Sequence, residues 1–163
     1  MLGIVSLPDF IDPRAYAPSE LLAIAQEIGL PERNLRQWLG LVLGEGDFNT
    51  ANWIDRGLFP KRVKPYIAPL PRLQLEQVQT SSIDGFQKLL FRTHDHLPVE
   101  SVAIPLHKER RVSICLSSQV GCVMGCAFCA TARMSQRRSL ESWEIMDQFI
   151  QTRQLVQQSG RMV

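Results

Sequence analysis

The sequence lacks the features that would place a chain in a membrane, in a secretory pathway or in a disulfide scaffold. No stretch approaches the roughly 18 apolar residues of a spanning helix. The N-terminus has no basic segment followed by a long apolar run, so we expect no signal peptide and no membrane partner. Only four cysteines occur in 163 residues, and three are clustered, which indicates a reducing, cytoplasmic location. Net charge is also small, since 18 Lys and Arg face 16 Asp and Glu, and it neither demands nor forbids a nucleic-acid partner.

What the chain does contain is a compact cysteine cluster, Cys122-Val-Met-Gly-Cys126-Ala-Phe-Cys129. Thiolates are soft ligands for iron–sulfur clusters, and three of them can hold a [4Fe-4S] cluster while one iron stays open. Gly121 and Gly125 leave the backbone free to curl around such a group. A structural zinc site is the alternative, but zinc usually takes four protein ligands in paired knuckles, and the sequence has no second knuckle.

The first part of the chain predicts a small helical domain over residues 1–72. Residues 1–18 hold three prolines and predict an extended lead-in. Apolar residues then recur at helical spacing, with Ser19 as the expected cap of the first helix and Gly29 as its end. The expected helices cover 19–28, 31–43, 47–57 and 60–67.

Six basic side chains of this domain are candidates for contacts with RNA phosphates. Composition alone favours the alternative, a solvated surface, because the chain is near neutral. The six are Arg33, Arg36, Arg56, Lys61, Arg62 and Lys64.

From residue 73 to residue 163 the pattern changes to that of an α/β domain. Strands are expected near 73–78, 86–91, 99–104 and 110–116, with turns at Asp84-Gly85 and between His94 and Pro98. The cysteine loop, 122–129, follows the last of these strands. A helix over 142–158 comes next, capped by Ser139 or Glu141, ended by Gly160, with an apolar face of Ile145, Met146, Phe149, Ile150 and Leu155.

The residues around the cysteines carry a resemblance to a known family. The run Cys115-Leu-Ser-Ser-Gln-Val-Gly-Cys122, followed by Met124-Gly-Cys126-Ala-Phe-Cys129-Ala-Thr, resembles the radical-SAM methyltransferases of the RlmN/Cfr family. Upstream, Ser82-Ile-Asp-Gly-Phe-Gln-Lys and Glu100-Ser-Val-Ala-Ile-Pro105 agree with it. The likeness is close from about Ser81 to Met146 and looser before that.

This resemblance implies a fold and a reaction. The fold is the beginning of a radical-SAM partial (β/α)6 barrel, its first βα unit plus the preceding strands, after an N-terminal helical domain that helps to hold RNA. The reaction is methylation of C2 of adenosine in 23S rRNA, or in tRNA, through a methyl-cysteine intermediate, although relatives that act at C8 share these motifs. The implied cofactors are a [4Fe-4S] cluster and S-adenosylmethionine, and the implied electron donor is a protein such as flavodoxin. We expect a monomer.

The resemblance also assigns individual residues. Cys122, Cys126 and Cys129 correspond to the cluster ligands, and Phe128 to an aromatic residue that shields the cluster or the adenine of the cofactor. Glu100 matches a glutamate that accepts a proton, whereas its strand pattern alone favours a solvent-exposed face. Cys115 matches the cysteine that resolves the covalent intermediate through a transient disulfide; by itself, a lone strand cysteine is more often a buried apolar residue.

Two features set limits on these expectations. The partner of Cys115, a methyl-carrying cysteine, has no counterpart here, and the 53 residues from Arg111 to Val163 are too few for a barrel of roughly 180 residues. We therefore expect this chain to be the N-terminal part of an enzyme and inactive by itself. The alternative is a truncated, non-catalytic module that binds iron–sulfur or RNA.

His94, His96 and His107 lie in polar segments, and we expect none of them to bind a metal. Ala132 stands where the family usually has glycine, so its methyl group would strain the loop if its φ angle were positive.

Overall fold

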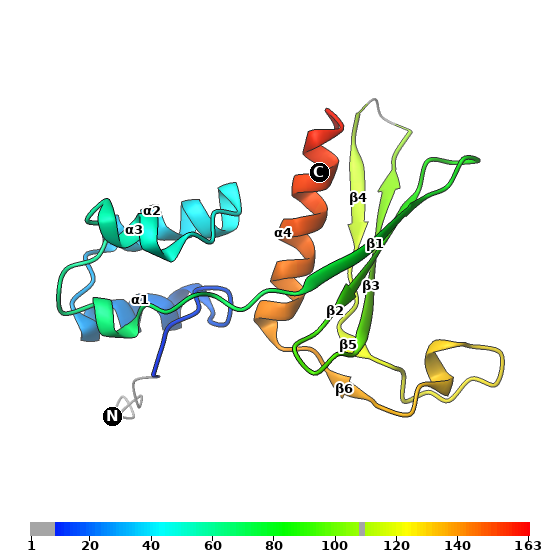
Figure 1. The fold of residues 1–163 in the computed structure, drawn as a ribbon, viewed down its shortest axis with the longest axis horizontal. Helices are drawn as coiled ribbons and strands as arrows, with labels where there is room; N and C mark the ends of the chain where they lie inside the picture. Colours follow the sequence, from blue (N-terminus) through cyan, green and yellow to red (C-terminus); the bar gives the residue numbers. More distant parts are fainter. Residues whose placement is uncertain (1–8, 108–109) are drawn as a thin grey trace. The chain divides into compact units, whose positions relative to one another are not determined.

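The computed structural model describes residues 9–107 and 110–163, and the chain divides into two compact units, Met1–Pro71 and Arg72–Val163 (Figure 1). The predicted lead-in falls partly on residues 1–8, which lie outside the described part, and it continues through turns up to the first helix. Among the described residues no helix is both long enough and apolar enough to cross a membrane.

The first unit is helical, as predicted. Its core is built on three aromatic side chains, with Trp38 in edge-to-face contact with Trp53 at 6.2 Å and with Phe59 at 5.2 Å between ring centroids. Both tryptophans are buried, so this cluster joins the helix that carries Trp38 to the helix that carries Trp53 and to Phe59 after it. The elements are α1 (Pro18–Ile28), α2 (Glu32–Leu39), a π-helical turn (Gly40–Glu45), α3 (Thr50–Asp55) and a 3-10 turn (Lys64–Tyr66).

Two details of this unit differ from the prediction. Ser19 is not the cap of α1, because the helix begins one residue earlier at Pro18 and the cap is Ala17, whose amide donates to Glu20 Oε2 at 2.8 Å. Proline suits a first helical position, since its missing N–H needs no partner there. The fourth predicted helix is also absent from residues 60–67, which form only the short 3-10 turn; Pro65 cannot donate to a longer helical ladder.

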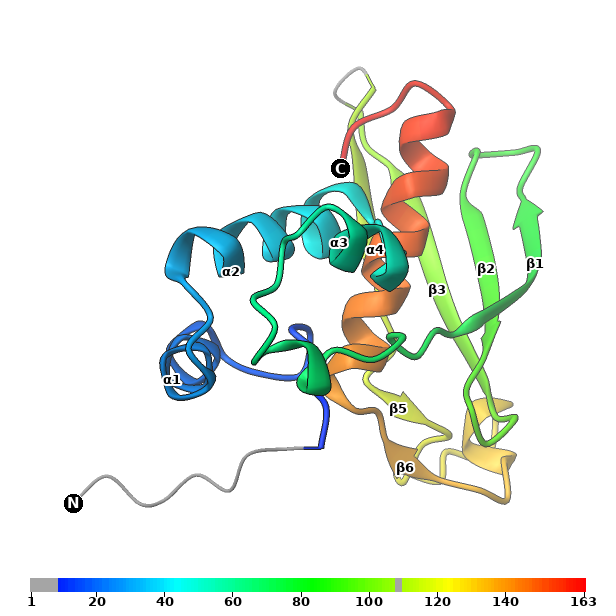
Figure 2. The ribbon, with the colours of Figure 1, turned by 60° about the vertical axis from the view of Figure 1, so that its left-hand side comes forward.

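The second unit is a four-stranded antiparallel sheet with one long helix, α4 (Ser142–Gln158), against one face (Figure 2). The predicted bounds of this helix are confirmed. The cap is Glu141, one of the two predicted. The C-terminal cap is Ser159, and Gly160 follows it with a φ of 73° and an amide that donates to the Gln157 carbonyl at 2.9 Å, so it ends the helix as predicted. The strands, in spatial as well as chain order, are β1 (Gln74–Thr80), β2 (Gln87–Arg92), β3 (Pro98–Pro105) and β4 (Val112–Cys115).

The sheet register decides which side chains reach which face. Leu89 and Phe91 are buried against Trp143 of α4 in one apolar cluster. Val99 is buried on the same face, in a second cluster with Val120 and Leu140. Lys88 lies opposite Val102, Leu90 opposite Glu100, and Val102 opposite Cys115. Directly paired residues share a face, so a second set of side chains lies on the face away from α4: Lys88, Leu90, Glu100, Val102 and Cys115.

The chain leaves α4 and returns to the sheet beside β4. Met162 forms an isolated parallel bridge with Arg111, and the Val112 amide donates to the Met162 carbonyl at 2.8 Å. A strand, a helix and a parallel return form the unit from which parallel sheets are built. Nothing in the described residues extends this unit into further parallel strands.

Candidate functional site

The cysteine loop connects the two strands of a short hairpin that the sequence did not reveal. Strand β5 (Gln119–Val120) pairs antiparallel with β6 (Arg138–Ser139), and Val120 lies opposite Arg138. The intervening residues 121–137 are therefore closed at their base, and all three clustered cysteines lie within them. The loop therefore has two fixed ends, an N-terminal root at β5 and a C-terminal root at β6.

Helix α4 anchors the N-terminal root of the loop through Gln148, whose side chain is fully buried. Its Oε1 accepts from the Ser117 amide at 3.2 Å, and its Nε2 donates to the Ser117 carbonyl at 3.1 Å. The same Oε1 accepts from Ser101 Oγ of β3 at 2.9 Å. One amide thus satisfies both backbone groups of Ser117, two residues after β4, and fixes the chain as it enters the loop.

The C-terminal root is held by Arg138. Its guanidinium donates to both carboxylate oxygens of Glu144 at 2.7 and 2.8 Å and to both oxygens of Asp95 at 2.9 and 2.8 Å. The guanidinium and the Thr93 hydroxyl hold the pKa of Asp95 well below its usual range, and the two carboxylates raise the pKa of Arg138. Glu144 is completely buried, so this network joins β6, α4 and the turn after β2.

The three histidines that we expected to bind no metal lie between β2 and β3 and just after β3. His94 Nδ1 lies 3.9 Å from Glu144 Oε1, and together with Asp95 these groups approach within the reach of a metal ion. Both carboxylates are already shared with Arg138, however, and the cluster therefore acts as an ion-pair network. His96 takes a positive φ of 61° in the turn, and His107 is exposed.

The backbone of the loop turns at two glycines with φ near +65°, Gly121 and Gly125. A Cβ atom at Gly121 would lie 2.8 Å from the Gln136 carbonyl oxygen, whereas one at Gly125 would meet nothing within 4 Å. Gly121 is thus required both for its angle and for the close approach of the two roots. Ala132 has no positive φ, because it lies in the 3-10 turn Thr131–Arg133, so its methyl group imposes no strain.

All four cysteines are free thiols, and each lies in the described part of the chain. Cys122, Cys126 and Cys129 are half-buried, so they stay accessible to a ligand. The backbone amides of Ala132 and Thr131 lower the pKa of the Cys129 thiol below its ordinary value by stabilising its thiolate. Three accessible thiols on one short, glycine-hinged loop are a donor set that fits a [4Fe-4S] cluster with one open iron.

Large apolar side chains on this loop point into solvent. Phe128 is 90% exposed, Met124 77% and Val123 68%. Phe128 can therefore have its predicted shielding role only toward a bound cluster or cofactor, since its ring covers little of the described part of the chain.

A hollow of about 430 Å³ lies between the open sheet face and the loop. Glu100 and Lys88 line it from the sheet, with 3.2 Å between Lys88 Nζ and Glu100 Oε1. Gly121, Thr131 and Met134 line it from the loop side. The structure thus brings Glu100 beside the cysteine loop. Cys115 is exposed on the same sheet face, but it does not line this hollow.

The residues that sequence reasoning missed are the buried polar groups of α4. The predicted apolar face is only partly right, because Ile150 is fully buried while Ile145, Met146, Phe149 and Leu155 are half-buried. Glu144, Asp147 and Gln148 are completely buried instead. Their helical spacing of three and four residues was the available signal, since it places polar groups in one stripe.

No protein-family model matches the chain. A curated protein of Myxococcus xanthus described as a probable RNA methyltransferase is 40% identical over 144 residues, 86% of this chain and 40% of its own length. A probable dual-specificity RNA methyltransferase RlmN of a Synechococcus species is 36% identical over 143 residues, 85% of this chain and 39% of its own.

The fold leads to the same group of proteins. The crystal structure of a radical SAM methyltransferase from Sphaerobacter thermophilus superposes with a TM-score of 0.75 at 27% identity, over 94% of this chain and 44% of that one. The chain thus spans about two fifths of the length of these relatives. Sequence and fold together show that the chain belongs to the RlmN-like family of radical-SAM methyltransferases, of which it represents the N-terminal portion.

Proposed function

We propose that this chain forms the RNA-docking unit and the cluster loop of a radical-SAM methyltransferase that methylates C2 of adenosine in 23S rRNA, with tRNA as a second candidate substrate. One observation carries the proposal. Three accessible cysteines lie on a loop whose two roots are fixed by α4, beside a hollow lined by a carboxylate. The family's relatives named as RNA methyltransferases supply the substrate class.

In this proposal Cys122, Cys126 and Cys129 hold a [4Fe-4S] cluster, and the amides of Thr131 and Ala132 favour the thiolate that Cys129 must present. When bound, the cluster and S-adenosylmethionine supply one-electron radical chemistry. The chain's own residues position and enclose that chemistry. Phe128 covers the site with its exposed ring and reduces access of water.

Glu100 is the proposed proton acceptor. It lines the hollow beside the loop, and its half-exposed carboxylate lies 3.2 Å from the ammonium group of Lys88. Cys115 is the proposed resolving cysteine. Its exposure on the same sheet face leaves its thiol open to the sulfur of a methyl-carrying cysteine that is still linked to the base. As the transient disulfide formed, the S–C bond of that link would break and its electron pair would pass to the methylated base.

The proposed partners follow from these roles. RNA docks to the helical unit, and an electron donor such as flavodoxin reduces the cluster. We propose that the protein is a monomer in the cytoplasm, where it can meet both RNA and the electron donor.

Anaerobic reconstitution with iron and sulfide tests the ligand assignment. The parent chain should turn brown, absorb broadly in the visible and bind about four irons. Changing Cys122, Cys126 or Cys129 to Ala should abolish this absorbance, and Cys115→Ala is the matched control that should retain it. Loss of the absorbance in Cys115→Ala alone would overturn the assignment. A stable cluster that never cleaves S-adenosylmethionine, in a longer natural chain as well, would favour a non-catalytic module.

A further inference from the structure

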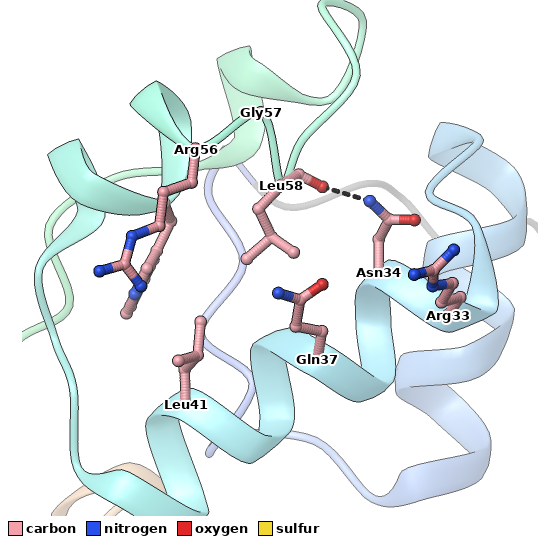
Figure 3. Close-up of a pocket in the computed structure, with 8 residues that line it drawn as sticks. Arg33, Asn34, Gln37, Leu41, Arg56, Gly57 and Leu58 are labelled. Carbon is pink, nitrogen blue, oxygen red and sulfur yellow. Dashed lines mark hydrogen bonds between the residues drawn. The ribbon is translucent and has the colours of Figure 1, made fainter.

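The helical unit contains a second hollow, of about 200 Å³, that the proposed chemistry does not use. It lies between α2 with its π-helical extension and the turn that follows α3 (Figure 3). Asn34 Nδ2 donates to the Leu58 carbonyl at 2.7 Å and ties these two walls together. Gly57, with φ of +70°, makes the turn and leaves open space above it.

The hollow has an apolar floor and a basic rim. Leu58 and Trp53 are buried and Leu41 is half-buried, so they form the floor. The exposed side chains of Arg33 and Gln37 reach it from α2, and that of Arg56 from the end of α3. No acidic residue is among those that line it. Two guanidinium groups and an amide around an apolar floor are chemistry suited to a nucleotide, which has an anionic phosphate and a flat base.

Among the four arginines predicted to contact RNA, the side-chain partners single out this pair. Arg36 is bound to Glu32 at 2.6 Å, and Arg62 is folded back onto the Gly29 carbonyl at 2.7 Å. By contrast, no hydrogen bond or ion pair within the described residues holds the side chain of Arg33 or of Arg56. Two arginines without such partners thus line one hollow from its two sides, whereas Arg36 and Arg62 are already bound within the unit.

We infer that this hollow binds one unpaired nucleotide of the RNA substrate, with Arg33 and Arg56 on the two phosphates that flank it and the Gln37 amide on the edge of its base. The inference rests on the proposed function for its ligand class. A volume of about 200 Å³ is below the usual range of roughly 300–1,000 Å³ for cofactor-sized ligands, and therefore suits a single small group. Bases that are unpaired can be splayed out and read at their edges, whereas those in a duplex cannot.

The test compares two charge-matched double variants of the full 163-residue chain. The first, Arg33→Gln with Arg56→Gln, removes both cations of the hollow. The second, Lys61→Gln with Lys64→Gln, removes two exposed cations of the same unit that do not line it. Affinity for a fluorescent single-stranded RNA and for a duplex of the same sequence is measured over a series of salt concentrations. Thermal unfolding checks that each variant stays folded.

For single-stranded RNA, we expect the Arg33→Gln, Arg56→Gln variant (the hollow pair) to reduce the slope of log K against log salt by about 1.4, because two phosphate contacts are lost. The lysine pair should change it far less, and duplex affinity should respond equally to both pairs. Gln37→Ala should weaken single-strand binding by about two- to tenfold without altering the salt slope.

Equal effects of the two double variants on single-stranded RNA would overturn the inference while leaving the proposed function intact. An equal loss for duplex and single strand in the hollow pair would also overturn it, since the site would then not select unpaired nucleotides. Failure of the proposed function would appear differently, as a parent chain that binds no RNA or as cysteine variants that keep the full cluster absorbance.

Discussion

Replacing Arg138 by Gln should destabilise the second unit by about 2–3 kcal/mol. The change leaves the Glu144 carboxylate, which is fully buried, without the guanidinium that meets both of its oxygens. Breaking a buried ion pair from one side costs about 3–5 kcal/mol. The loss expected here is smaller, about 2–3 kcal/mol, because the Arg138 side chain is 27% exposed and water screens part of its interaction with Glu144.

The measurement is urea unfolding followed by hydrogen–deuterium exchange of peptides from β2, β3 and α4, which reports on this unit alone. With an m-value of about 1–3 kcal/mol/M, the unfolding midpoint should fall by about 0.7–3 M urea. The matched control is Arg92→Gln, which removes a bond to the partly exposed Glu76 at 2.9 Å and should cost less than about 1 kcal/mol.

A second change distinguishes a lost contact from an unpaired charge. The double variant Arg138→Gln with Glu144→Gln removes the buried charge as well, so it should recover part of the stability lost in the single variant. A loss in Arg138→Gln no larger than in the Arg92→Gln control would refute the reasoning. So would a double variant whose loss equals the sum of the two single ones.

Two further predictions concern the same loop. Gly125→Ala should cost about 1 kcal/mol because of its positive φ alone, while Gly121→Ala should cost clearly more, since its Cβ would also meet the Gln136 oxygen at 2.8 Å; thermal unfolding and iron content per chain measure both, and equal losses would contradict the close approach. Asp95→Asn should destabilise the parent at pH 7. Because the pKa of Asp95 is lowered on folding, its contribution is fully present above its ordinary value of about 3.9 and is lost as pH falls through the folded pKa. The parent and variant curves of urea midpoint against pH should therefore converge in acid, and a constant gap would exclude this titration.

The sequence by itself determined the parts that depend on local chemistry. The spacing of Cys122, Cys126 and Cys129 places three thiols on one loop, whatever the surrounding fold. The bounds of α4 follow from capping and helical periodicity, and the Asp84-Gly85 turn from the positive φ that Gly85 takes. These signals are carried by residues a few positions apart, and single-sequence reasoning can therefore reach them.

Tertiary structure alone decided what depends on distant partners. Glu100 and Cys115 share a sheet face because of strand register, which pairs residues far apart in the chain. Gln148 reaches Ser117 over 31 positions, and Arg138 reaches Asp95 over 43, so neither anchor of the loop could be found from spacing. In the same way, Arg33 and Arg36 look alike in sequence, and only the folded unit shows that Arg36 is bound to Glu32 while Arg33 lines a hollow with Arg56.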